Sequence, residues 1–307
     1  MSAYGFKPKV DNLLTQPAEN TSTPALEVEE LKTELIEDGE QFLPKPETFE
    51  YEHAARYQII GAIKALEAPR SGFESLDRLI AFVPGKTTVL GAETHVGKTT
   101  LSSNIAANVA ARQGKKVLMF VPESGVEATV LHIACYLNNK TEKELTDEEK
   151  RTKIPTLKLV ERAISIVDIE RISFVEKPDL IIIDHIHYLL KDDKNTTSSI
   201  GEAIRGLCEL SKKLNTHVLV VAHLKKPDHG RENEIPSIYR LKDSSALYQD
   251  PDLVILLHRR RRSVELALPG EDRLEMDGLI IVEKNRINGR SGIVKFYFDK
   301  ERHSFLI

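Results

Sequence analysis

Residues 92–99 read Ala-Glu-Thr-His-Val-Gly-Lys-Thr, in which Gly-Lys-Thr follows a small residue at a fixed interval. This spacing matches a phosphate-binding loop with alanine in place of its first glycine. Gly97 lets backbone N–H groups approach phosphate oxygens, Lys98 reaches the β- and γ-phosphates, and the Thr99 hydroxyl ligates Mg²⁺. A strand-like run precedes the loop and a helix-like run follows it, which disfavours a chance turn. We predict a site for Mg²⁺ and ATP (or another nucleoside triphosphate) made by Ala92, Glu93, Thr94, His95, Val96, Gly97, Lys98, Thr99 and Thr100.

Three apolar runs downstream of this loop read as strands, and each ends in a polar side chain. In an open parallel sheet, ligands bind at the carboxyl ends of the strands. Asp184 would there hold the water shell of Mg²⁺, unless it only caps a helix. Glu123 would polarise the water that attacks the γ-phosphate, although a plain surface position explains it equally well. His223 would sense the γ-phosphate, and its place after two similar residues favours this role over a structural one.

The remaining pattern alternates strands with helices, which is typical of an α/β fold with a parallel sheet. Strands are expected at residues 87–91, 115–123, 179–189 and 216–224. Helices are expected within residues 71–80, 98–113, 125–138, 158–172 and 199–214. Three late strands have little helix between them and should extend the sheet in antiparallel fashion; they lie at residues 252–259, 278–284 and 292–298.

The acidic excess of the chain lies in its N-terminal part. The 307 residues include 47 acidic and 43 basic side chains, of which residues 1–50 hold 11 acidic and 4 basic ones, so the remainder is mildly basic. Residues 1–48 mix Pro, Thr, Asn and Glu without sustained periodicity and are expected to form a largely disordered acidic arm. Residues 49–69 are expected to form a helix, and residues 70–307 the folded domain. The mildly basic body gives weak support to a polyanion partner.

The composition is that of an ordinary soluble protein, with 41% hydrophobic and 29% charged residues. The N-terminus lacks the apolar core of a signal peptide, and no apolar stretch is long enough to cross a bilayer. Cys135 and Cys208 lack metal-ligand spacing and are expected to be reduced thiols in the core. We therefore expect a cytoplasmic protein, in the host cytoplasm if the gene is a phage gene, without a membrane partner.

Six ordered blocks of the sequence resemble the RecA-type motor domain of DnaB-family hexameric replicative helicases. They read GAETHVGKTT, VPES, IIIDHI, VVAHLKKP, SSALYQDPDLVILLHR and EKNRINGRSGIVKFYFDKERHSF. The likeness is greatest to the phage primase–helicase branch and its mitochondrial relative Twinkle, which have histidine at the γ-phosphate sensor. It covers about residues 70–307 and implies a RecA-like P-loop NTPase core with a mainly parallel central sheet and antiparallel C-terminal strands. Residues 1–48 match nothing in the family, and we expect no zinc-binding or primase module upstream.

The resemblance implies a role for each site residue. The phosphate loop keeps the role given above, while Asp184 organises Mg²⁺, Glu123 is the catalytic base and His223 is the γ-phosphate sensor. In the block EKNRING, Lys284 and Arg286 stand where the family supplies a lysine and an arginine finger to the nucleotide of a neighbouring subunit. A cation from another chain stabilises charge in the transition state and makes hydrolysis depend on assembly.

A polar, basic segment at residues 223–236 corresponds to family loops that line the central channel and grip single-stranded DNA. Its DNA-binding candidates are Lys225, Lys226, His229 and Arg231. Lysines suit sequence-independent contacts with phosphates. Residues 191–199 are a second, less basic candidate, and the basic run at residues 258–262 fits a solvated hairpin face better. These loops contain no evident aromatic platform, so the expected grip is electrostatic.

The resemblance implies an ATP-dependent, ring-forming replicative helicase that translocates on single-stranded DNA and unwinds duplex DNA in the 5′ to 3′ direction. It implies a homo-oligomer, a hexameric ring in the family, in which the helix at residues 49–69 docks on the adjacent subunit. Packing of this helix on its own domain is an equally consistent interpretation. A primase, loader or polymerase would be contacted through the acidic arm.

Two other classes of protein share parts of this pattern. A RecA-fold ATPase without unwinding activity, such as a recombination mediator or a KaiC-like regulatory ring, would share most of the core. The HLKKP loop and the SSALYQDPD block favour a helicase instead. A small-molecule P-loop kinase would need a lid and an acceptor site, and it would leave Lys284 and Arg286 unexplained.

Overall fold

In the computed structural model, Ala62–Ile307 form one compact unit. The structure describes residues 66–151, 153–162, 165–189, 196–225, 235–241, 245–259 and 278–307. The predicted acidic arm at residues 1–48 and nearly all of the predicted helix at residues 49–69 lie outside these residues. None of the helices that the structure describes is both long and apolar enough to span a membrane.

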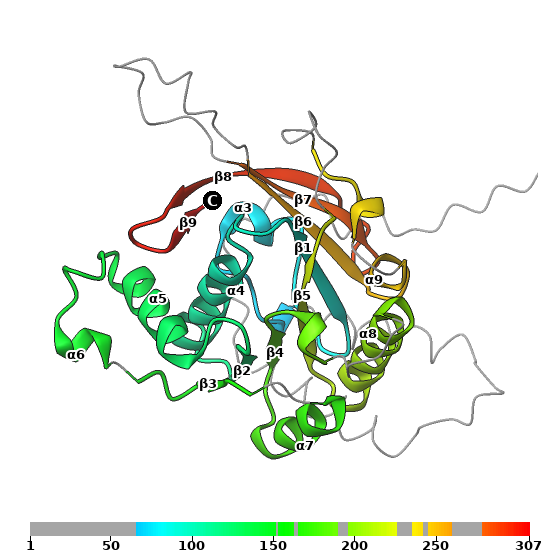
Figure 1. Cartoon of the computed structure of the whole chain (residues 1–307), viewed down its shortest axis with the longest axis horizontal. Helices are drawn as coiled ribbons and strands as arrows, with labels where there is room; N and C mark the ends of the chain where they lie inside the picture. The colour runs from blue at the N-terminus through cyan, green and yellow to red at the C-terminus, as the bar shows by residue number, and fades with distance from the viewer. Residues whose placement is uncertain are drawn as a thin grey trace, which may run out of the picture. The chain divides into compact units, whose positions relative to one another are not determined.

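A mixed sheet forms the centre of the described structure (Figure 1). Its strands are β1 (Thr87–Ala92), β2 (Val117–Phe120), β3 (Leu157–Val160), β4 (Leu180–Ile183), β5 (His217–His223), β6 (Leu253–Arg259), β7 (Gly278–Asn285), β8 (Gly292–Asp299) and β9 (Ser304–Leu306). Their order in the sheet is β3-β2-β4-β5-β1-β6-β7-β8-β9. The strands from β3 to β6 pair in parallel, and β7, β8 and β9 are added antiparallel. This confirms the predicted parallel sheet with an antiparallel C-terminal extension.

The central strands β1, β2 and β4 are buried along their whole length, with helices on both faces of the sheet. Adjacent residues of β1 demonstrate this, since successive side chains of a strand point to opposite faces. Leu90 packs in a core cluster with side chains of α4 (Lys98–Ala107), whereas Val89 packs in a second cluster with side chains of α8 (Thr196–Lys213). Figure 1 shows α4 and α5 (Val126–Asn138) on one side of the central strands and α8 on the other.

The other described helices are short, apart from α7. They are α3 (Glu74–Asp77), α6 (Asp147–Lys150), α7 (Ile166–Glu176) and α9 (Ala246–Gln249). A π-helical turn at Asn108–Arg112 continues α4, and single 3-10 turns lie at Ile186–Leu189 and Ile238–Arg240. Both cysteines are free thiols: Cys135 is buried and Cys208 is half-buried.

The predicted helix at residues 158–172 is wrong in its first part. Leu157–Val160 form the edge strand β3, which pairs in parallel with β2. The helix α7 begins only after Ser165, whose hydroxyl accepts a hydrogen bond from the Asp168 N–H while the Asp168 carboxylate accepts one from the Ser165 N–H. This capping box fixes the start of the helix, and the residues before it are left to extend the sheet.

The predicted strand at residues 179–189 also ends earlier than expected. β4 stops at Ile183, and Ile186–Leu189 form a 3-10 turn. Between them, His185 has a φ of 98°, which is outside the extended region and turns the chain out of the sheet. The turn leaves Asp184 and His185 at the carboxyl edge of the sheet. The strand β9 and the helix α9 were not predicted, because each has at most four residues.

Candidate nucleotide site

The parallel strands bring the predicted site residues to one edge of the sheet. The carboxyl ends of β2, β4, β5 and β1 lie side by side in this order. The pairing of β5 with β1 sets His223 directly beside Ala92, the first residue of the phosphate loop. Glu123 follows β2, and Asp184 follows β4. All three polar residues predicted from strand ends therefore lie at the same edge as the loop.

The phosphate loop is a tight turn between β1 and α4. Gly97 precedes α4 with a φ of 105° and a ψ of 25°, a left-handed conformation that glycine adopts more readily than any other residue. A β-carbon at Gly97 would also lie 3.0 Å from the ring of Phe305 in β9. The first backbone N–H groups of α4 have no partner within the helix, so the helix begins as an anion-binding terminus. The local structure is the one that a phosphate loop requires.

Lys98 is buried within this loop. Its ammonium donates a hydrogen bond to the backbone carbonyl of Glu93 at 2.7 Å. Burial lowers the pKa of Lys98 to about 8, and the carboxylates of Asp184, Glu123 and Glu93 oppose this shift. The ammonium is thus held over the loop by a single backbone contact, from which it can turn to a phosphate oxygen.

Thr99 and Asp184 form the predicted Mg²⁺ pair. The Thr99 hydroxyl donates a hydrogen bond to Oδ1 of Asp184 at 3.1 Å. Burial, and secondarily the nearby Glu123 charge, raise the pKa of Asp184 to about 6, whereas Thr99 and Lys98 favour the ionised form. The second oxygen, Oδ2, is buried and has no hydrogen-bond partner among the described residues. A hydroxyl and a carboxylate with one unused oxygen are the hard oxygen ligands that Mg²⁺ takes. These residues therefore fit the ion.

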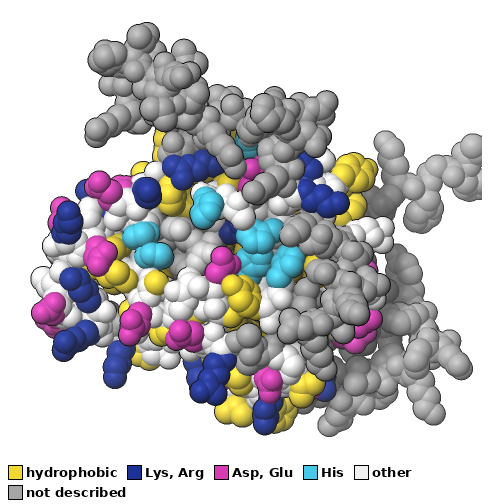
Figure 2. All heavy atoms as spheres, in the orientation of Figure 1, with side chains coloured by type: hydrophobic (Ala, Val, Ile, Leu, Met, Phe, Trp, Pro, Cys, Tyr) yellow, Lys and Arg dark blue, Asp and Glu magenta, His cyan; other side chains and the backbone are white. Residues whose placement is uncertain are grey.

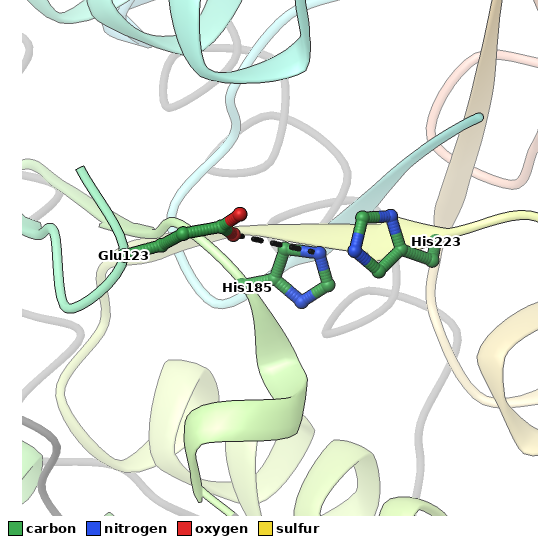
Figure 3. Close-up of side chains that lie close together, drawn as sticks. All are labelled: Glu123, His185 and His223. Atoms are coloured by element: carbon green, nitrogen blue, oxygen red, sulfur yellow. Dashed lines mark ion pairs between the residues drawn. The ribbon is translucent and has the colours of Figure 1, made fainter. Parts of the chain in front are cut away.

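Glu123, His185 and His223 meet beside the loop (Figure 3). Oε2 of Glu123 lies 3.9 Å from Nε2 of His185, and the rings of His185 and His223 have centroids 3.7 Å apart. The side chain of Glu123 is half exposed, whereas that of His185 is buried. The carboxylate is therefore accessible to a water molecule while the imidazoles behind it are fixed.

His185 and His187 were missed as site residues. Their ring nitrogens Nδ1 lie 3.3 Å apart, and the His187 ring lies 5.9 Å from that of His223. Figure 2 shows histidine side chains gathered near the middle of the face in view. The sequence carried a local signal for them, since both histidines follow Asp184 within three positions.

A second contact that the sequence did not indicate joins the phosphate loop to the segment after β5. The guanidinium of Arg240 pairs with the Glu93 carboxylate at 2.7 Å and donates to the Lys225 carbonyl at 2.7 Å. The Lys225 N–H donates to the Arg240 carbonyl at 2.7 Å, and Leu224 and Leu241 form an antiparallel bridge. The start of the predicted DNA-binding segment is therefore bound to residues 240–241, which lie a few positions beyond its end, and through Arg240 to the phosphate loop.

Of the predicted DNA-binding residues, Lys225 is exposed at the end of β5. Lys226, His229 and Arg231 lie outside the described residues. Tyr239, one position before Arg240, is 86% exposed, so an aromatic side chain does accompany this segment. The second candidate loop at residues 191–199 is described only from Thr196 onward.

The basic run at residues 258–262 is described only for His258 and Arg259. Arg259 is the last residue of β6, and its guanidinium lies over the Phe298 ring, 4.6 Å from the centroid. The run thus begins at the end of a strand that pairs antiparallel with β7. Its interpretation as a hairpin face stays a prediction.

Lys284 and Arg286 lie at the opposite edge of the sheet from the phosphate loop. The Arg286 N–H donates to the Asp252 carbonyl at 2.8 Å, and Asp252 in turn contacts Thr87, the first residue of β1. Five residue steps along β1 separate Thr87 from Ala92, where the loop begins. At about 3.3 Å of rise per residue, this distance is about 16 Å. Neither cation therefore reaches the nucleotide site of its own chain.

The two cations differ in their contacts. The Lys284 ammonium donates to the carbonyls of Tyr248 at 2.6 Å and Gln249 at 2.8 Å, and burial lowers its pKa to about 8. The Arg286 side chain is exposed and makes no hydrogen bond or ion pair with any residue that the structure describes. Lys284 is held inside its own chain, whereas Arg286 extends toward solvent.

Comparison with known sequences agrees with this arrangement. A family model described as DnaB-like helicase C terminal domain matches residues 69–306. The replicative DNA helicase DnaC of Bacillus subtilis is 26% identical over 258 residues, which cover 77% of this chain and 56% of the relative. The replicative DNA helicase DnaB of Mycoplasma genitalium is 28% identical over 264 residues, which cover 77% of this chain and 55% of the relative. The chain spans about half the length of the curated relatives it matches.

Solved structures show the same fold. A DnaB-like replicative helicase, described with its interactions with primase, aligns with a TM-score of 0.68 at 19% identity, over 91% of this chain and 71% of that one. A KaiC-like protein from Pyrococcus horikoshii aligns with a TM-score of 0.55 at 17% identity, over 78% of this chain and 97% of that one. At these identities the likeness concerns the fold alone.

Proposed function

Since the chain belongs to the family of DnaB-like helicase C-terminal domains, we propose that it is an ATP-driven motor that translocates on single-stranded DNA and unwinds duplex DNA. Its fold is RecA-like, as the sequence predicted. One observation carries the proposal: the phosphate loop, Asp184, Glu123 and His223 meet at one sheet edge, from which the basic segment after His223 continues. The relatives reported above are bacterial helicases, and the greater likeness to the phage branch stays a prediction.

In this proposal the chain's own groups prepare ATP for attack by water. The loop N–H groups cradle the β- and γ-phosphates, and Lys98 exchanges its contact with the Glu93 carbonyl for a phosphate oxygen. Glu123, half exposed at the edge of the site, orients the attacking water and accepts its proton. His223 lies behind it, where an imidazole can report whether the γ-phosphate is present.

Thr99 and Asp184 would hold Mg²⁺ in this site, and the ion would neutralise charge that develops on the phosphates. The unused Oδ2 of Asp184 supports this assignment, since a buried carboxylate oxygen without a partner is costly unless a ligand meets it. Burial also disfavours the charged form of Asp184, so a cation at this place restores its ionisation.

Hydrolysis in this proposal needs a second copy of the chain. Arg286 lies about 16 Å along the sheet from its own phosphate loop, and its side chain makes no ion pair with the described residues. An exposed guanidinium in this position suits insertion into the nucleotide site of a neighbour. We propose a homo-oligomeric ring, a hexamer by family likeness, in which Lys284 would serve as a second cation of the same interface by exchanging its contacts with the Tyr248 and Gln249 carbonyls for the neighbouring site.

The segment between β5 and Arg240 would couple hydrolysis to DNA. Lys225, with Lys226, His229 and Arg231, would hold backbone phosphates of the single strand. The ion pair between Arg240 and Glu93 joins this segment to the phosphate loop. A movement of the loop during hydrolysis would therefore also move this segment. The acidic arm at residues 1–48 would provide the contact with a primase, loader or polymerase.

Forked DNA duplexes with a single tail test the proposal. With ATP and Mg²⁺, the protein should separate the strands of a fork that bears a 5′ tail and leave a fork with a 3′ tail intact. The alternative is a RecA-fold ATPase without unwinding activity, favoured by the fold that the chain shares with a KaiC-like protein. ATP hydrolysis without separation of either fork would support this alternative and contradict a helicase.

A further inference from the structure

We propose that Glu123, His185 and His223 form a binding site for a divalent transition-metal ion such as Zn²⁺. Each residue offers one ligand atom, and the three atoms lie within 4.8 Å of one another. Figure 3 shows the three side chains converging from three different segments of the chain. Glu123 follows β2, His185 follows β4 and His223 is the last residue of β5. These strands are hydrogen-bonded neighbours, so the sheet holds the three segments side by side.

The ligand set selects a transition metal over Mg²⁺. Imidazole nitrogen suits Zn²⁺, Co²⁺ and Ni²⁺, whereas Mg²⁺ prefers oxygen ligands and keeps its waters. Two histidines and one carboxylate are also the protein ligands of a common type of zinc site with one open position. The pair of Thr99 and Asp184 offers only oxygen atoms. Mg²⁺ would therefore bind to this pair, and a transition-metal ion would bind to the two histidines and Glu123.

Binding an ion requires the ligands to rearrange: the three ligand atoms lie within 4.8 Å of one another, and the His185 and His223 rings, with centroids 3.7 Å apart, must turn so that each directs a nitrogen at the ion. Bonds of about 2 Å from nitrogen and oxygen to zinc place neighbouring tetrahedral ligands roughly 3.3 Å apart. The distance from Glu123 Oε2 to His185 Nε2 is 3.9 Å, so the ligands must approach by a fraction of an ångström on this side. The half-exposed Glu123 side chain has the freedom to make this approach.

A contact outside the ligand set supports the orientation of His185. Nδ1 of His185 lies 3.3 Å from Nδ1 of His187, within hydrogen-bonding distance. A metal-binding histidine usually has its second ring nitrogen engaged in this way, because the contact fixes the ring and the tautomer. With Nδ1 engaged by His187, Nε2 is the atom directed toward Glu123.

The local charge also favours a cation. The carboxylates of Glu123 and Asp184 act on the same Lys98 ammonium, which leaves these three groups with a net negative charge. A divalent cation bound to Glu123 balances this charge.

Metal binding at this place would inhibit hydrolysis. This inhibition rests on the proposed function, in which Glu123 accepts a proton from water and His223 senses the γ-phosphate. A bound Zn²⁺ would occupy the lone pairs of both, so neither could act. Lys98 and the loop N–H groups are not ligands, so ATP binding would persist. The result would be a nucleotide-bound enzyme that does not turn over.

Titration with metal alone tests the site without nucleotide or DNA. The full chain, freed of metal with a chelator, is titrated with Co²⁺, whose visible absorption reports coordination geometry, and Zn²⁺ is then added to displace it. We expect one ion per chain. Glu123→Gln and His185→Asn should each weaken binding by about tenfold or more. Asn suits position 185 because it tolerates the left-handed φ of 98° there.

His303→Asn is the matched control, since His303 is also a histidine at positive φ, with a value of 46°, and lies in the turn before β9. This variant should bind Co²⁺ like the wild-type chain. Circular dichroism of each variant establishes that it is folded. No stoichiometric binding by the wild-type chain, or equal weakening in His303→Asn, would overturn the proposal. Because the titration contains no nucleotide, its outcome is independent of whether the chain is a helicase.

Discussion

Lys98 supplies the positive charge that should matter most for the contact of the phosphate loop with ATP. Lys98→Ala should lower ATP hydrolysis by about a hundredfold or more, because the cation that would contact the β- and γ-phosphates is lost. Phosphate release at saturating ATP and Mg²⁺ measures this. Lys116→Ala, at an exposed lysine beside the amino end of β2, should stay within about twofold of the wild-type rate. Near-normal turnover of Lys98→Ala would contradict the nucleotide site.

The ion pair of Glu93 and Arg240 should contribute to stability. Both side chains are largely buried, with 9% and 20% exposed. Arg240→Ala removes this ion pair from the largely buried Glu93 carboxylate and should lower the free energy of unfolding by about 3 kcal/mol. Adding Glu93→Gln removes the buried negative charge, so the double variant should regain part of this loss. Urea unfolding of the four chains gives the coupling energy, and simple additivity of the two single variants would show that the pair is not coupled.

Spacing and strand ends indicated part of the candidate site. Gly97, Lys98 and Thr99 were predicted from their spacing, and Asp184 from the end of an apolar strand; the structure brings Thr99 and Asp184 into contact, and their roles stay predictions. The partner of Glu93 was not found, because Arg240 lies 147 positions away and only the folded sheet brings the two together. His185 had a local signal beside Asp184, but one histidine near a strand end gives no indication of its ring contacts with His223.

At the scale of elements, His217 holds β5 against β1 and makes the fold sensitive to acid. It is fully buried, with Nδ1 2.8 Å from the Val83 carbonyl and Nε2 2.8 Å from the Thr88 hydroxyl. The carbonyl can only accept, so Nδ1 donates its proton and Nε2 accepts from Thr88. Both nitrogens are thereby satisfied in the neutral ring, and burial lowers the pKa of His217 from 6.5 to about 4.

Acid should therefore destabilise the native sheet through His217. The unfolded chain binds a proton at this histidine below pH 6.5, while the native chain does so only near pH 4, so stability falls as pH is lowered through this window. The loss should be on the order of 3 kcal/mol. Urea unfolding at pH 7 and pH 4.5 should show a smaller loss for His217→Gln than for the wild-type chain. An equal loss in both would exclude His217 as its source.

The segment after β5 should bind DNA through charge alone. Replacing both Lys225 and Lys226 with Ala should weaken affinity for unrelated single strands alike and reduce the salt slope of binding by up to about two units. Fluorescence anisotropy at several salt concentrations measures both quantities. Tyr239→Ala serves as the comparison, since it removes an exposed side chain that carries no charge and should leave both the affinity and the salt slope nearly unchanged. An unchanged slope in the lysine variant would contradict phosphate contacts by these residues.

Prediction of the elements succeeded where the hydrophobic pattern was long and failed where a single residue changed it. The strands β4 and β5 were found because their apolar runs are continuous. The stretch at residues 158–172 was mistaken for one helix, because its apolar residues suit either period until Ser165 caps the second half. The positive φ of His185 likewise ended a run that the residue types alone would have continued.

At the scale of the whole molecule, the separation of Arg286 from its own phosphate loop predicts that hydrolysis depends on assembly. Arg286→Ala should keep ATP binding, which Lys98 and the loop supply, yet lower hydrolysis by about a thousandfold or more. A mixture of Arg286→Ala with Lys98→Ala should regain part of the activity, because some interfaces then join an intact loop to an intact arginine. Phosphate release as a function of mixing ratio measures this.

Protein concentration and a second arginine variant provide the controls for this mixing experiment. Activity above the sum of the two separate preparations should appear only at concentrations where chains associate and exchange. Arg290→Ala, at an exposed arginine four positions further along, should hydrolyse ATP like the wild-type chain. Normal hydrolysis by Arg286→Ala in the presence of single-stranded DNA would exclude a role for this residue in a neighbouring site.

The placement of the phosphate loop and Arg286 on opposite edges of the sheet would also restrict the symmetry of the proposed ring. A contact that joins one edge of a copy to the other edge of the next copy is heterologous, so a growing row of copies always keeps one free edge of each kind. Such growth ends only when the rotation between neighbours divides a full turn evenly, which is one sixth of a turn for a hexamer. A slightly different rotation would give an open helical filament from the same contact. Ring closure is therefore decided by the angle between subunits, and variants that alter this angle should convert closed particles into fibres without removing any residue of the nucleotide site.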